Sequence, residues 1–579
     1  MKGYPFIIIK IQLYNNKINV ILIIKEDKLI MIDYIDKNGL EHFVQTLNNK
    51  LNAKMDKIDG SEGDVLTFDK TGNMISKSMD EVYKHPSYIQ DVYNVDAEQV
   101  YQDTRPTDWM PMPDDDYVQD NEIYLLTNGN ATSFSIYINN SSATIKIEHG
   151  VMNESGEFIP NEDDTKTGVT GSSGYYYNQT IISDSQLMIK VSIPANTSGY
   201  YITRFEPREY SNIIEIKARC TRCSQFDCSY CSNTSSYRSD NSTIYNRNYY
   251  PITGLRYFSL LGGNNITAYT THMFYGCSSL ITVRELDTSK ATGFGCMFYG
   301  CSSLVTVPKF TTSKVTDMQY MFYGCILLLS IPDFDTTNVT DMSHMFYSCK
   351  SLATIPLLNT SSVTDMSQMF YECTSLITIP EIDFSKVTDI SSMFYECLSL
   401  DTIPRLNTDK ATKCQYLFYN CKSLKSVSLI NLSQVTDISY LFYGCSSLTT
   451  IPELLCNLST KMIYAFYNCS SLTSIPLLYL SAGNTGDMTE TVSKNAFYNC
   501  TSLSSIIINS TKTFCSFTID LRYSNLDYEA LINLFNNFPI GNNSYKINSK
   551  LIITNNPGVK DLTDEDKSIM TEKYWTLVC

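Results

Sequence analysis

The strongest constraint on this chain is a strict 24-residue repeat in its C-terminal half. Phenylalanine recurs at nine positions that are each 24 residues apart, and a tenth copy, Phe497, follows an insertion of seven residues. A cysteine lies three residues after each of these phenylalanines. Such spacing indicates one stacked coil per repeat, because a unit this short cannot bury its apolar face alone. The nine regularly spaced residues are Phe274, Phe298, Phe322, Phe346, Phe370, Phe394, Phe418, Phe442 and Phe466.

A single repeat indicates what each coil contains. Between Val315 and Cys325 the apolar residues are three and four apart, which predicts a short helix with Thr316 as its N-cap. An extended piece such as 376–380 follows and ends at a proline. Ten such coils would make a rod on the order of 50 Å long. The predicted core ladder includes Phe322, Cys325, Phe346, Cys349, Phe370, Cys373, Phe394 and Cys397.

The repeat unit Val-Thr-Asp-Met-Ser-x-Met-Phe-Tyr-x-Cys-x-Ser-Leu-x-Thr-Ile-Pro resembles the short, BspA-like class of leucine-rich repeat found in bacterial surface proteins. The resemblance covers residues 250–510 and is reproduced ten times. It implies a curved β-helical solenoid with an adhesive or binding role rather than catalysis. We therefore predict a mainly β protein with short helices, in which residues 213–510 form a leucine-rich-repeat solenoid with an N-terminal cap at 213–255.

The segments on either side of the repeats have their own patterns. Residues 121–212 alternate short Ile/Tyr/Val-rich runs with Gly, Asn, Ser and Asp turns, which is typical of a β-sandwich-like domain. Such a domain could bind carbohydrate or serve only as a scaffold. Residues 511–579 are predicted to form a C-terminal cap with two amphipathic helices, at 524–538 and 562–573, that cover the open end of the solenoid.

Residues 1–120 are predicted to form an attachment and oligomerisation region. Strand, turn and strand are expected around Asn15 and Asn16, and a hairpin with a Gly-Asn turn is expected at 64–75. Residues 38–58 are predicted to form a helix, either a short oligomerising coiled coil or a helix packed on the preceding strands. This helix and hairpin, with the segments 105–113 and 121–126, resemble the N-terminal attachment regions of bacteriophage tail fibres. The resemblance implies a virion component, and a homotrimer is plausible for such a fibre.

Charge and hydropathy exclude some classes of partner. The net charge of −16 argues against nucleic acid, because phosphate binding requires clustered Lys and Arg. No apolar run approaches the roughly 18 residues of a membrane span, so we expect no membrane insertion. Polar residues interrupt the apolar stretch 6–22, and we therefore expect no standard export signal.

Most of the 19 cysteines fall into two groups. Those of the repeat recur once per coil, which favours small buried side chains over metal ligands or disulfides. Four others form two C-x2-C pairs that could hold a structural Zn²⁺ tetrahedrally, although two disulfides or an irregular first coil would also explain them. No other cofactor is expected. The candidate zinc ligands are Cys220, Cys223, Cys228 and Cys231.

A tyrosine follows each repeat phenylalanine. The next position on a helix is turned by about 100°, so these rings should lie at or near the surface. Aromatic rings with a polar edge are common anchors in binding sites. The alternative is that the rings only stack between coils and shield the seam. The candidate ligand-binding residues are Tyr323, Tyr347, Tyr371, Tyr395, Tyr419 and Tyr443.

Catalytic signatures are absent from the sequence, and we expect no enzyme. The five histidines stand alone, and neither a phosphate-binding glycine loop nor an HExxH motif occurs. The leading hypothesis is a phage tail-fibre or receptor-binding protein, located in the virion tail, whose solenoid binds a protein or glycan receptor on a cell surface. The second is an extracellular BspA-like adhesin of the bacterial surface that binds host or matrix proteins. The third is a polysaccharide-degrading tail spike that uses paired carboxylates such as Glu372, Glu396 or Asp401.

Overall fold

The computed structural model divides the chain into two compact units, residues 1–109 and 110–579. Both are mainly β with a few short helices, as the sequence predicts. The structure describes residues 8–14, 17–23, 30–31, 65–68, 74–77, 96–139, 145–153, 156–161, 166–167, 176–193, 201–207, 212–223, 225–226, 228–237, 243–262, 266, 270–428, 430–452, 461–479, 495–509, 518–538, 540 and 550–579.

The described residues of the N-terminal unit form two small antiparallel sheets and one helix. The first sheet has the order β1-β2-β3, and β4 pairs with β5 at the place of the expected hairpin. Helix α4 (Ala97–Thr104) begins at Asp96, whose carboxylate accepts hydrogen bonds from the N–H groups of Glu98 and Gln99. The helix expected at 38–58 lies outside the described residues. The strands are β1 (Ile8–Tyr14), β2 (Lys17–Ile23), β3 (Ile30–Met31), β4 (Val65–Phe68) and β5 (Met74–Lys77).

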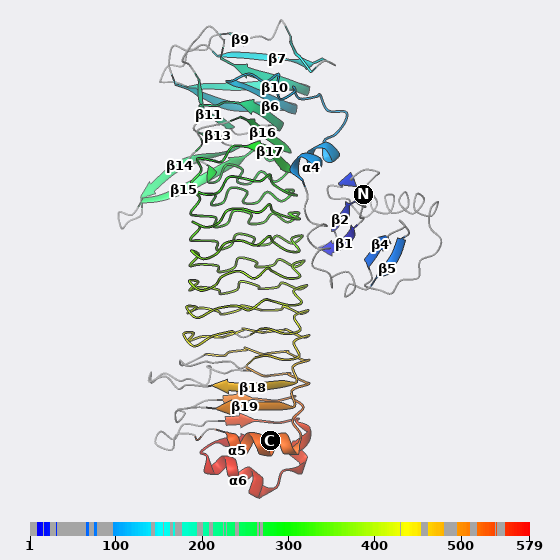
Figure 1. Ribbon diagram of the computed structural model, residues 1–579, viewed down its shortest axis with the longest axis vertical. Helices are drawn as coiled ribbons and strands as arrows, with labels where there is room; N and C mark the ends of the chain where they lie inside the picture. Colours follow the sequence, from blue (N-terminus) through cyan, green and yellow to red (C-terminus); the bar gives the residue numbers. More distant parts are fainter. Residues whose placement is uncertain are drawn as a thin grey trace. The chain divides into compact units, whose positions relative to one another are not determined.

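The C-terminal unit begins with a ten-stranded sheet (Figure 1). Its central strand, β6, pairs antiparallel with β10 along one edge and with β12 and β11 along the other. Strand β12 then pairs in parallel with β16, and β16 with β17. The strands are β6 (Glu122–Ile138), β7 (Lys146–Met152), β8 (Phe158–Pro160), β9 (Lys166–Thr167), β10 (Tyr176–Ser192), β11 (Ile202–Pro207), β12 (Ile213–Arg219), β13 (Gln225–Phe226), β16 (Tyr257–Leu261) and β17 (Thr282–Leu286).

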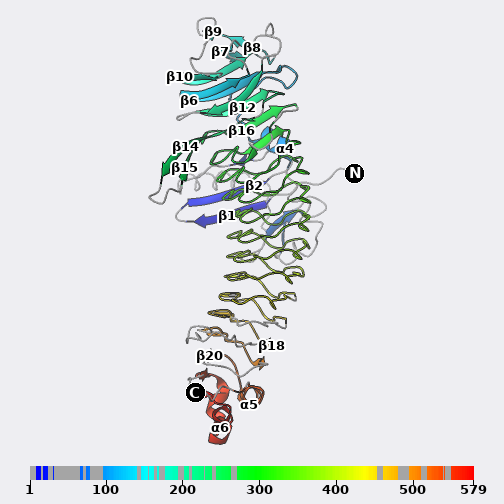
Figure 2. The same cartoon turned by 90° about the vertical axis from the view of Figure 1, so that its left-hand side faces the viewer.

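This sheet corrects the expectation of a β-sandwich at 121–212. In the described residues these strands form one sheet rather than two facing ones, because β6 pairs with β10 along one edge and with β11 and β12 along the other. Parallel pairing continues from β17 into the repeats through a bridge between Thr282 and Thr306. Within this unit the sheet therefore continues into the coils, as Figures 1 and 2 show. A separate hairpin, β14 (Ser229–Tyr237) with β15 (Thr243–Pro251), precedes the coils.

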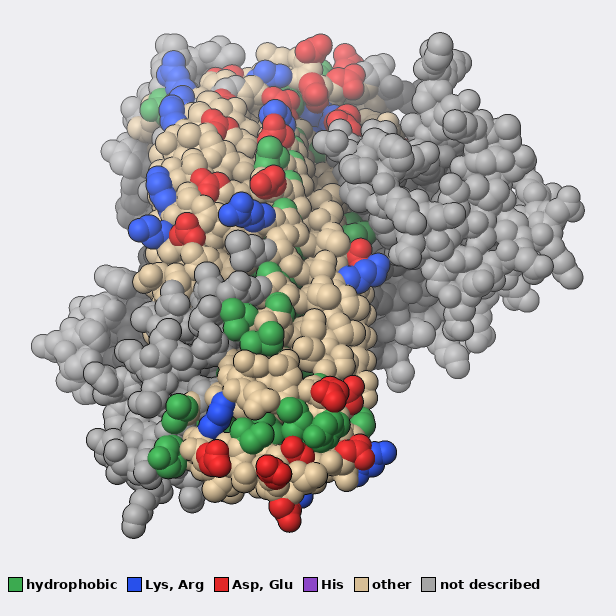
Figure 3. All heavy atoms as spheres, turned by 60° about the horizontal axis from the view of Figure 1, so that its bottom comes forward, with side chains coloured by type: hydrophobic (Ala, Val, Ile, Leu, Met, Phe, Trp, Pro, Cys, Tyr) green, Lys and Arg blue, Asp and Glu red, His purple; other side chains and the backbone are tan. Residues whose placement is uncertain are grey.

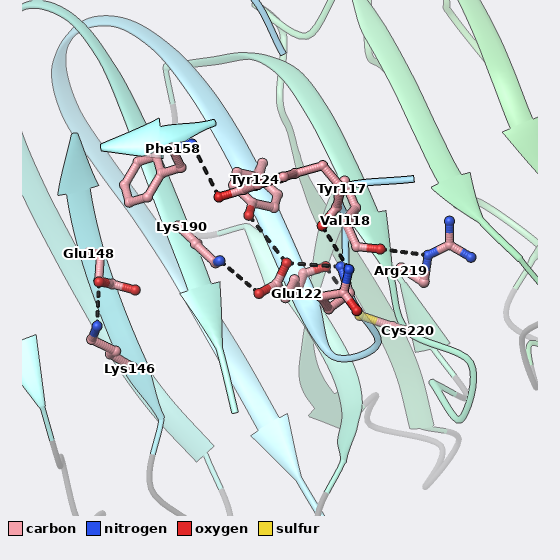
Figure 4. A network of polar contacts seen from close by, with 11 residues as sticks. Tyr117, Val118, Glu122, Tyr124, Lys146, Glu148, Phe158, Lys190, Arg219 and Cys220 are labelled. Atoms are coloured by element: carbon pink, nitrogen blue, oxygen red, sulfur yellow. Dashed lines mark hydrogen bonds and ion pairs between the residues drawn. The ribbon is translucent and has the colours of Figure 1, made fainter. Parts of the chain in front are cut away.

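The segment 110–121 is tied to the sheet by polar contacts (Figure 4). From β12, Lys217 Nζ donates to the carbonyl of Pro113 at 2.6 Å, and Arg219 Nε donates to that of Val118 at 2.8 Å. The backbone N–H of Phe158 donates to the hydroxyl of Tyr117 at 3.3 Å. This segment therefore helps to fix the first strands of the unit.

The short helix predicted in each coil is wrong. The segment instead forms successive turns. Some of its backbone N–H groups donate to carbonyls of the next coil, and others donate to a carbonyl three residues earlier in the same coil. The N–H groups of Tyr320 and Phe322 donate into the next coil, to the carbonyls of Ser343 and Met345, at 3.0 and 2.9 Å. The N–H of Tyr323 donates back to the carbonyl of Tyr320 at 3.1 Å. Two residues per coil also have positive φ, and such a backbone cannot continue a right-handed helix.

Stacking places two columns of side chains in the core. All ten repeat phenylalanines are fully buried, and the nine steps between neighbouring rings have centroid distances between 5.2 and 5.7 Å. We call this set the phenylalanine column. The repeat cysteines are free and buried, and each thiol from Cys301 onward donates to the carbonyl of the phenylalanine in the preceding coil at 3.0 or 3.1 Å. The phenylalanine and cysteine side chains therefore fill the interior of each coil.

The C-terminal end is covered by helices. Leu531, Leu534 and Phe535 of α5 are buried in the hydrophobic core. Both α5 and α6 lie within the segments predicted to be helical, and Thr563 and Asp566 form a capping box at α6. Exposed hydrophobic and acidic side chains are mixed at this end (Figure 3). The elements are β18 (Ser474–Tyr479), β19 (Ser505–Asn509), β20 (Thr518–Asp520), α5 (Tyr528–Asn537), β21 (Lys550–Ile552), η4 (Pro557–Asp561), α6 (Asp564–Glu572) and β22 (Thr576–Val578).

Candidate functional site

The tyrosines that follow the repeat phenylalanines stack into a column on the surface of the coils. Eight steps between neighbouring rings have centroid distances from 4.3 to 5.0 Å and nearly parallel planes, and the last step, between Tyr467 and Tyr498, is 5.4 Å. The rings are half-buried. We call Tyr275, Tyr299, Tyr323, Tyr347, Tyr371, Tyr395, Tyr419, Tyr443, Tyr467 and Tyr498 the tyrosine column.

This stacking determines what the tyrosine column can offer a ligand. Because each ring from Tyr299 to Tyr467 is covered on both faces by its neighbours, this part of the column presents ring edges and hydroxyl groups rather than ring faces. Burial, followed by the neighbouring tyrosines, raises the pKa of Tyr299 to about 12. Burial and Tyr323 also raise the pKa of Tyr347 to about 12. The hydroxyls are therefore neutral at physiological pH and can both donate and accept hydrogen bonds.

A second row of side chains lies beside this column and was missed by sequence reasoning. It consists of the residue three positions before each column tyrosine, and every member has a φ between 51° and 65°. Tyr320 stacks on His344 at 4.3 Å, and Tyr416 stacks on Tyr440 at 4.6 Å. We call this set the second row: His272, Cys296, Tyr320, His344, Gln368, Ser392, Tyr416, Tyr440, Tyr464 and Asn495.

A row of aspartates borders the second row. Asp317, Asp341, Asp365 and Asp389 bridge one another in successive coils, and each side chain accepts a hydrogen bond from the backbone N–H two residues later. Burial lowers the pKa of His344, while Asp365 and Asp341 oppose that shift. Burial therefore favours a neutral His344 at pH 7.

The candidate zinc cysteines lie at the start of the coils. Cys220, Cys223 and Cys228 are buried, and burial, followed by the neighbouring Cys223, raises the pKa of Cys220 well above its usual range. Within the described residues no group of three or more His, Cys, Asp or Glu side chains could hold a metal. The side chain of Cys231 is not among those described, so the four-thiol site stays a prediction.

Carboxylates that could act in pairs are mostly neutralised. Glu372 pairs with Lys350 at 3.4 Å, and Asp401 pairs with Lys425 at 2.9 Å. Glu372 and Glu396 occupy the same position in successive coils, immediately after the tyrosine column, whereas Asp401 lies in an extended segment. The three carboxylates suggested for a polysaccharide-degrading site are thus divided between two parts of the coil.

In the ten-stranded sheet, two carboxylates of a polar network are likewise paired with lysines (Figure 4). Glu122 accepts from Lys190 at 2.7 Å and from the hydroxyl of Tyr124 at 3.2 Å, while Glu148 pairs with Lys146. Burial, followed by Glu122, raises the pKa of Tyr124 strongly. This network stabilises the packing of charged side chains on the sheet.

The fold and the exposed aromatic rows define a repeat protein of stacked β-turn coils. Residues 268–377, 351–455 and 376–479 match the family model described as "Mycoplasma protein of unknown function, DUF285". Residues 479–548 match the model "BspA type Leucine rich repeat region (6 copies)". These matches support the resemblance to BspA-like leucine-rich repeats. No curated protein matches the chain.

Solved structures of repeat proteins share limited similarity with this chain. A leucine-rich repeat protein from Eubacterium ventriosum is 18% identical over 42% of this chain and 76% of its own, with a TM-score of 0.23. The Toll–Spatzle complex of Drosophila is 14% identical over 53% of this chain and 51% of its own, with a TM-score of 0.20. A TLR13–ssRNA13 complex is 12% identical over 51% of this chain and 54% of its own, with a TM-score of 0.17. Likenesses this low do not define the fold of the chain.

None of the helices in the described part of the chain has the length and apolar composition that a membrane crossing requires.

Proposed function

We propose that this chain is a non-enzymatic binding protein of the bacterial cell surface, and that it holds partner proteins on the face formed by the tyrosine column. The observation that carries the proposal is the column itself, an unbroken line of ten half-buried tyrosines along the coils. Tyrosine is enriched in protein interfaces because it combines apolar area with a hydrogen-bonding edge. The match of residues 479–548 to BspA-type repeats supports a surface role.

The stacked geometry changes how this proposal should be tested. Replacing the column tyrosines by alanine would remove contacts between coils, since Tyr371 stacks on both Tyr347 and Tyr395 at 4.4 and 4.3 Å. Replacing them by phenylalanine keeps the stack and removes only the hydroxyls. A triple variant, Y347F/Y371F/Y395F, therefore separates binding from folding.

The experiment measures retention of the full chain on a panel of immobilised extracellular-matrix proteins. We expect at least one matrix protein to be bound, and the triple variant to bind it at least tenfold more weakly with an unchanged thermal unfolding midpoint. A variant that loses the hydroxyl of an exposed tyrosine at the C-terminal end, Y574F, serves as the control and should bind normally. Equal binding by the triple variant, or no binding by the wild type, would reject the proposal.

A virion role is the second proposal, and it rests on residues 1–120. The hairpin of β4 and β5 lies in the segment whose sequence resembles tail-fibre attachment regions. A tail fibre of this kind would form a homotrimer in solution. The mass of the full chain by light scattering tests this directly, and a monomer would count against it.

A further inference from the structure

Two neighbouring coils differ from the other eight on the aromatic face. In the coils of Tyr371 and Tyr395, the second row holds Gln368 and Ser392, and the position after the tyrosine holds Glu372 and Glu396. The same two coils thus lack a second-row ring and gain a carboxylate. In the other eight coils the position after the tyrosine is glycine, serine or asparagine: Gly276, Gly300, Gly324, Ser348, Asn420, Gly444, Asn468 and Asn499.

The backbone at this position does not favour glutamate. Glu372 and Glu396 have φ values of 55° and 54°, in the left-handed region where glycine and asparagine are preferred. Four of the other coils have glycine here with φ between 72° and 74°. A strained residue that local conformation does not explain suggests a role for its side chain.

Carboxylates lie on both sides of the aromatic rows in these two coils. Asp365 and Asp389 precede Gln368 and Ser392 by three residues, on the second-row side. On the other side, Glu372 contributes to the raised pKa of Tyr371, although burial is the largest cause. We call Asp365, Gln368, Glu372, Asp389, Ser392 and Glu396 the acidic patch.

The acidic patch is incompletely neutralised. Lys413 pairs with Asp389 at 2.7 Å, and Lys350 pairs with Glu372 at 3.4 Å. For Asp365 and Glu396 the structure gives no ion pair with a lysine or arginine among the residues it describes. Asp365 accepts hydrogen bonds from Ser367, and Glu396 accepts one from Asn420 at 3.4 Å. These two carboxylates therefore have no ion-pair partner among the described residues, although the charge of Lys413 also acts on Asp365.

Ring stacking in the second row also stops at the patch. The ring of Tyr416 stacks on Tyr440 on one side, and in the coil on its other side the second row holds the short side chain of Ser392. Tyr395 lies 6.4 Å from Tyr416 with its plane tilted by 49°, so it does not stack there. Cations are attracted to the faces of aromatic rings, and a neighbouring carboxylate strengthens the interaction.

We propose that the acidic patch binds a lysine or arginine side chain from a basic segment of a partner protein. The occupant follows from charge complementarity, since the unpaired Asp365 and Glu396 carboxylates flank the aromatic rows next to the unstacked side of Tyr416. The proposal deepens the proposed function and rests on it, because it names the chemistry of the partner that the tyrosine face would hold.

The experiment titrates the full chain with fluorescently labelled penta-lysine, with penta-glutamate as the negative probe. D365N/E396Q should bind penta-lysine at least tenfold more weakly than the wild type. The control D333N/E381Q removes two exposed carboxylates from the extended segments of nearby coils, so the change in net charge is the same. It should bind within twofold of the wild type. Equal losses in both variants, or no binding by the wild type, would overturn the proposal.

A second pair of variants tests the gap in the aromatic row. S392Y places a ring beside Tyr416 and should weaken penta-lysine binding at least tenfold. The control C296Y places a ring at the second-row position between His272 and Tyr320, where that row also lacks one. In this region Gly300 and Gly324 occupy the position that Glu372 and Glu396 occupy in the patch, so C296Y should bind penta-lysine normally. Similar binding by S392Y and the wild type would reject the assigned site. Matrix binding that still depends on the column hydroxyls would then show that the proposed function survives without this inference.

Discussion

The phenylalanine and tyrosine columns are one residue apart in every coil, and both repeat with the spacing of the stack. The phenylalanine rings are fully buried, with most centroids about 5.5 Å apart. The tyrosine rings are half-buried and closer, at 4.3 to 4.6 Å for most of the column. Tight stacking therefore does not require burial, and it leaves one edge of each tyrosine accessible. The comparison separates a column that stabilises the coils from one that can also contact a partner.

The largest expected effect comes from removing one ring from each column. Phe370→Ala should destabilise the chain by about 3–5 kcal/mol, because it leaves a cavity in a fully packed core. Tyr371→Ala loses two stacked pairs at a half-buried site and should cost about 1–3 kcal/mol. Denaturant unfolding followed by circular dichroism measures both. Equal losses would remove the distinction between the two columns.

Alkaline pH should weaken the packing of the repeat cysteines and of the tyrosine column. Burial raises the pKa of the Cys500 thiol to about 12 from an ordinary value of 9.0, and Tyr299 and Tyr347 are raised to about 12 from 10.0. A raised folded-state pKa means that the unfolded chain releases its proton first, so the stability is complete below pH 9 and is lost as pH rises toward 12. The thermal unfolding midpoint should be similar at pH 7 and pH 9 and should be lower at pH 10.5. A constant midpoint would show that these groups are not buried in this way.

The smallest expected effect is a gain. Glu396→Gly relieves a left-handed backbone position at φ 54° and should stabilise the fold by about 1 kcal/mol. The same change should weaken penta-lysine binding if the acidic patch acts as proposed. Asn468→Gly, which relieves the same position at φ 60° in a coil away from the acidic patch, should stabilise the fold and leave binding unchanged. A loss of stability in both variants would show that these side chains serve the coil itself.

The sequence predicts the spacing of the ladder but not its local geometry. Residues 24 apart along the chain form the bridges between coils, as for Asp341 and Asp365, which follows from the periodicity alone. The apolar spacing of three and four also suggested a helix, but positive φ at Tyr320 and hydrogen bonds into the next coil replace it with turns. Nothing in the identity of a tyrosine or a glutamine indicates a left-handed backbone, which usually requires glycine or asparagine.

The candidate site was accessible to sequence reasoning only in part. A tyrosine at every repeat drew attention to the column, while the second row looked merely variable because it contains His344, Gln368, Ser392 and Tyr416 at one position. Its importance appears only when the structure shows that the rings of this row stack across successive coils. The continuation of β12 into β16 was likewise hidden, since parallel pairing between distant segments leaves no local pattern.

Hydroxyl-radical labelling of the folded chain, read by mass spectrometry of the repeat peptides, most directly tests whether stacking buries one column and exposes the other. Met369, Phe370 and Tyr371 are adjacent in the chain, and the first two are fully buried while the third is half-buried. The account predicts that Tyr371 and its equivalents are oxidised while Phe370 and the intrinsically more reactive Met369 are protected until the chain is unfolded. Oxidation of Met369 and Phe370 in the native protein at the rate of the unfolded chain would contradict it.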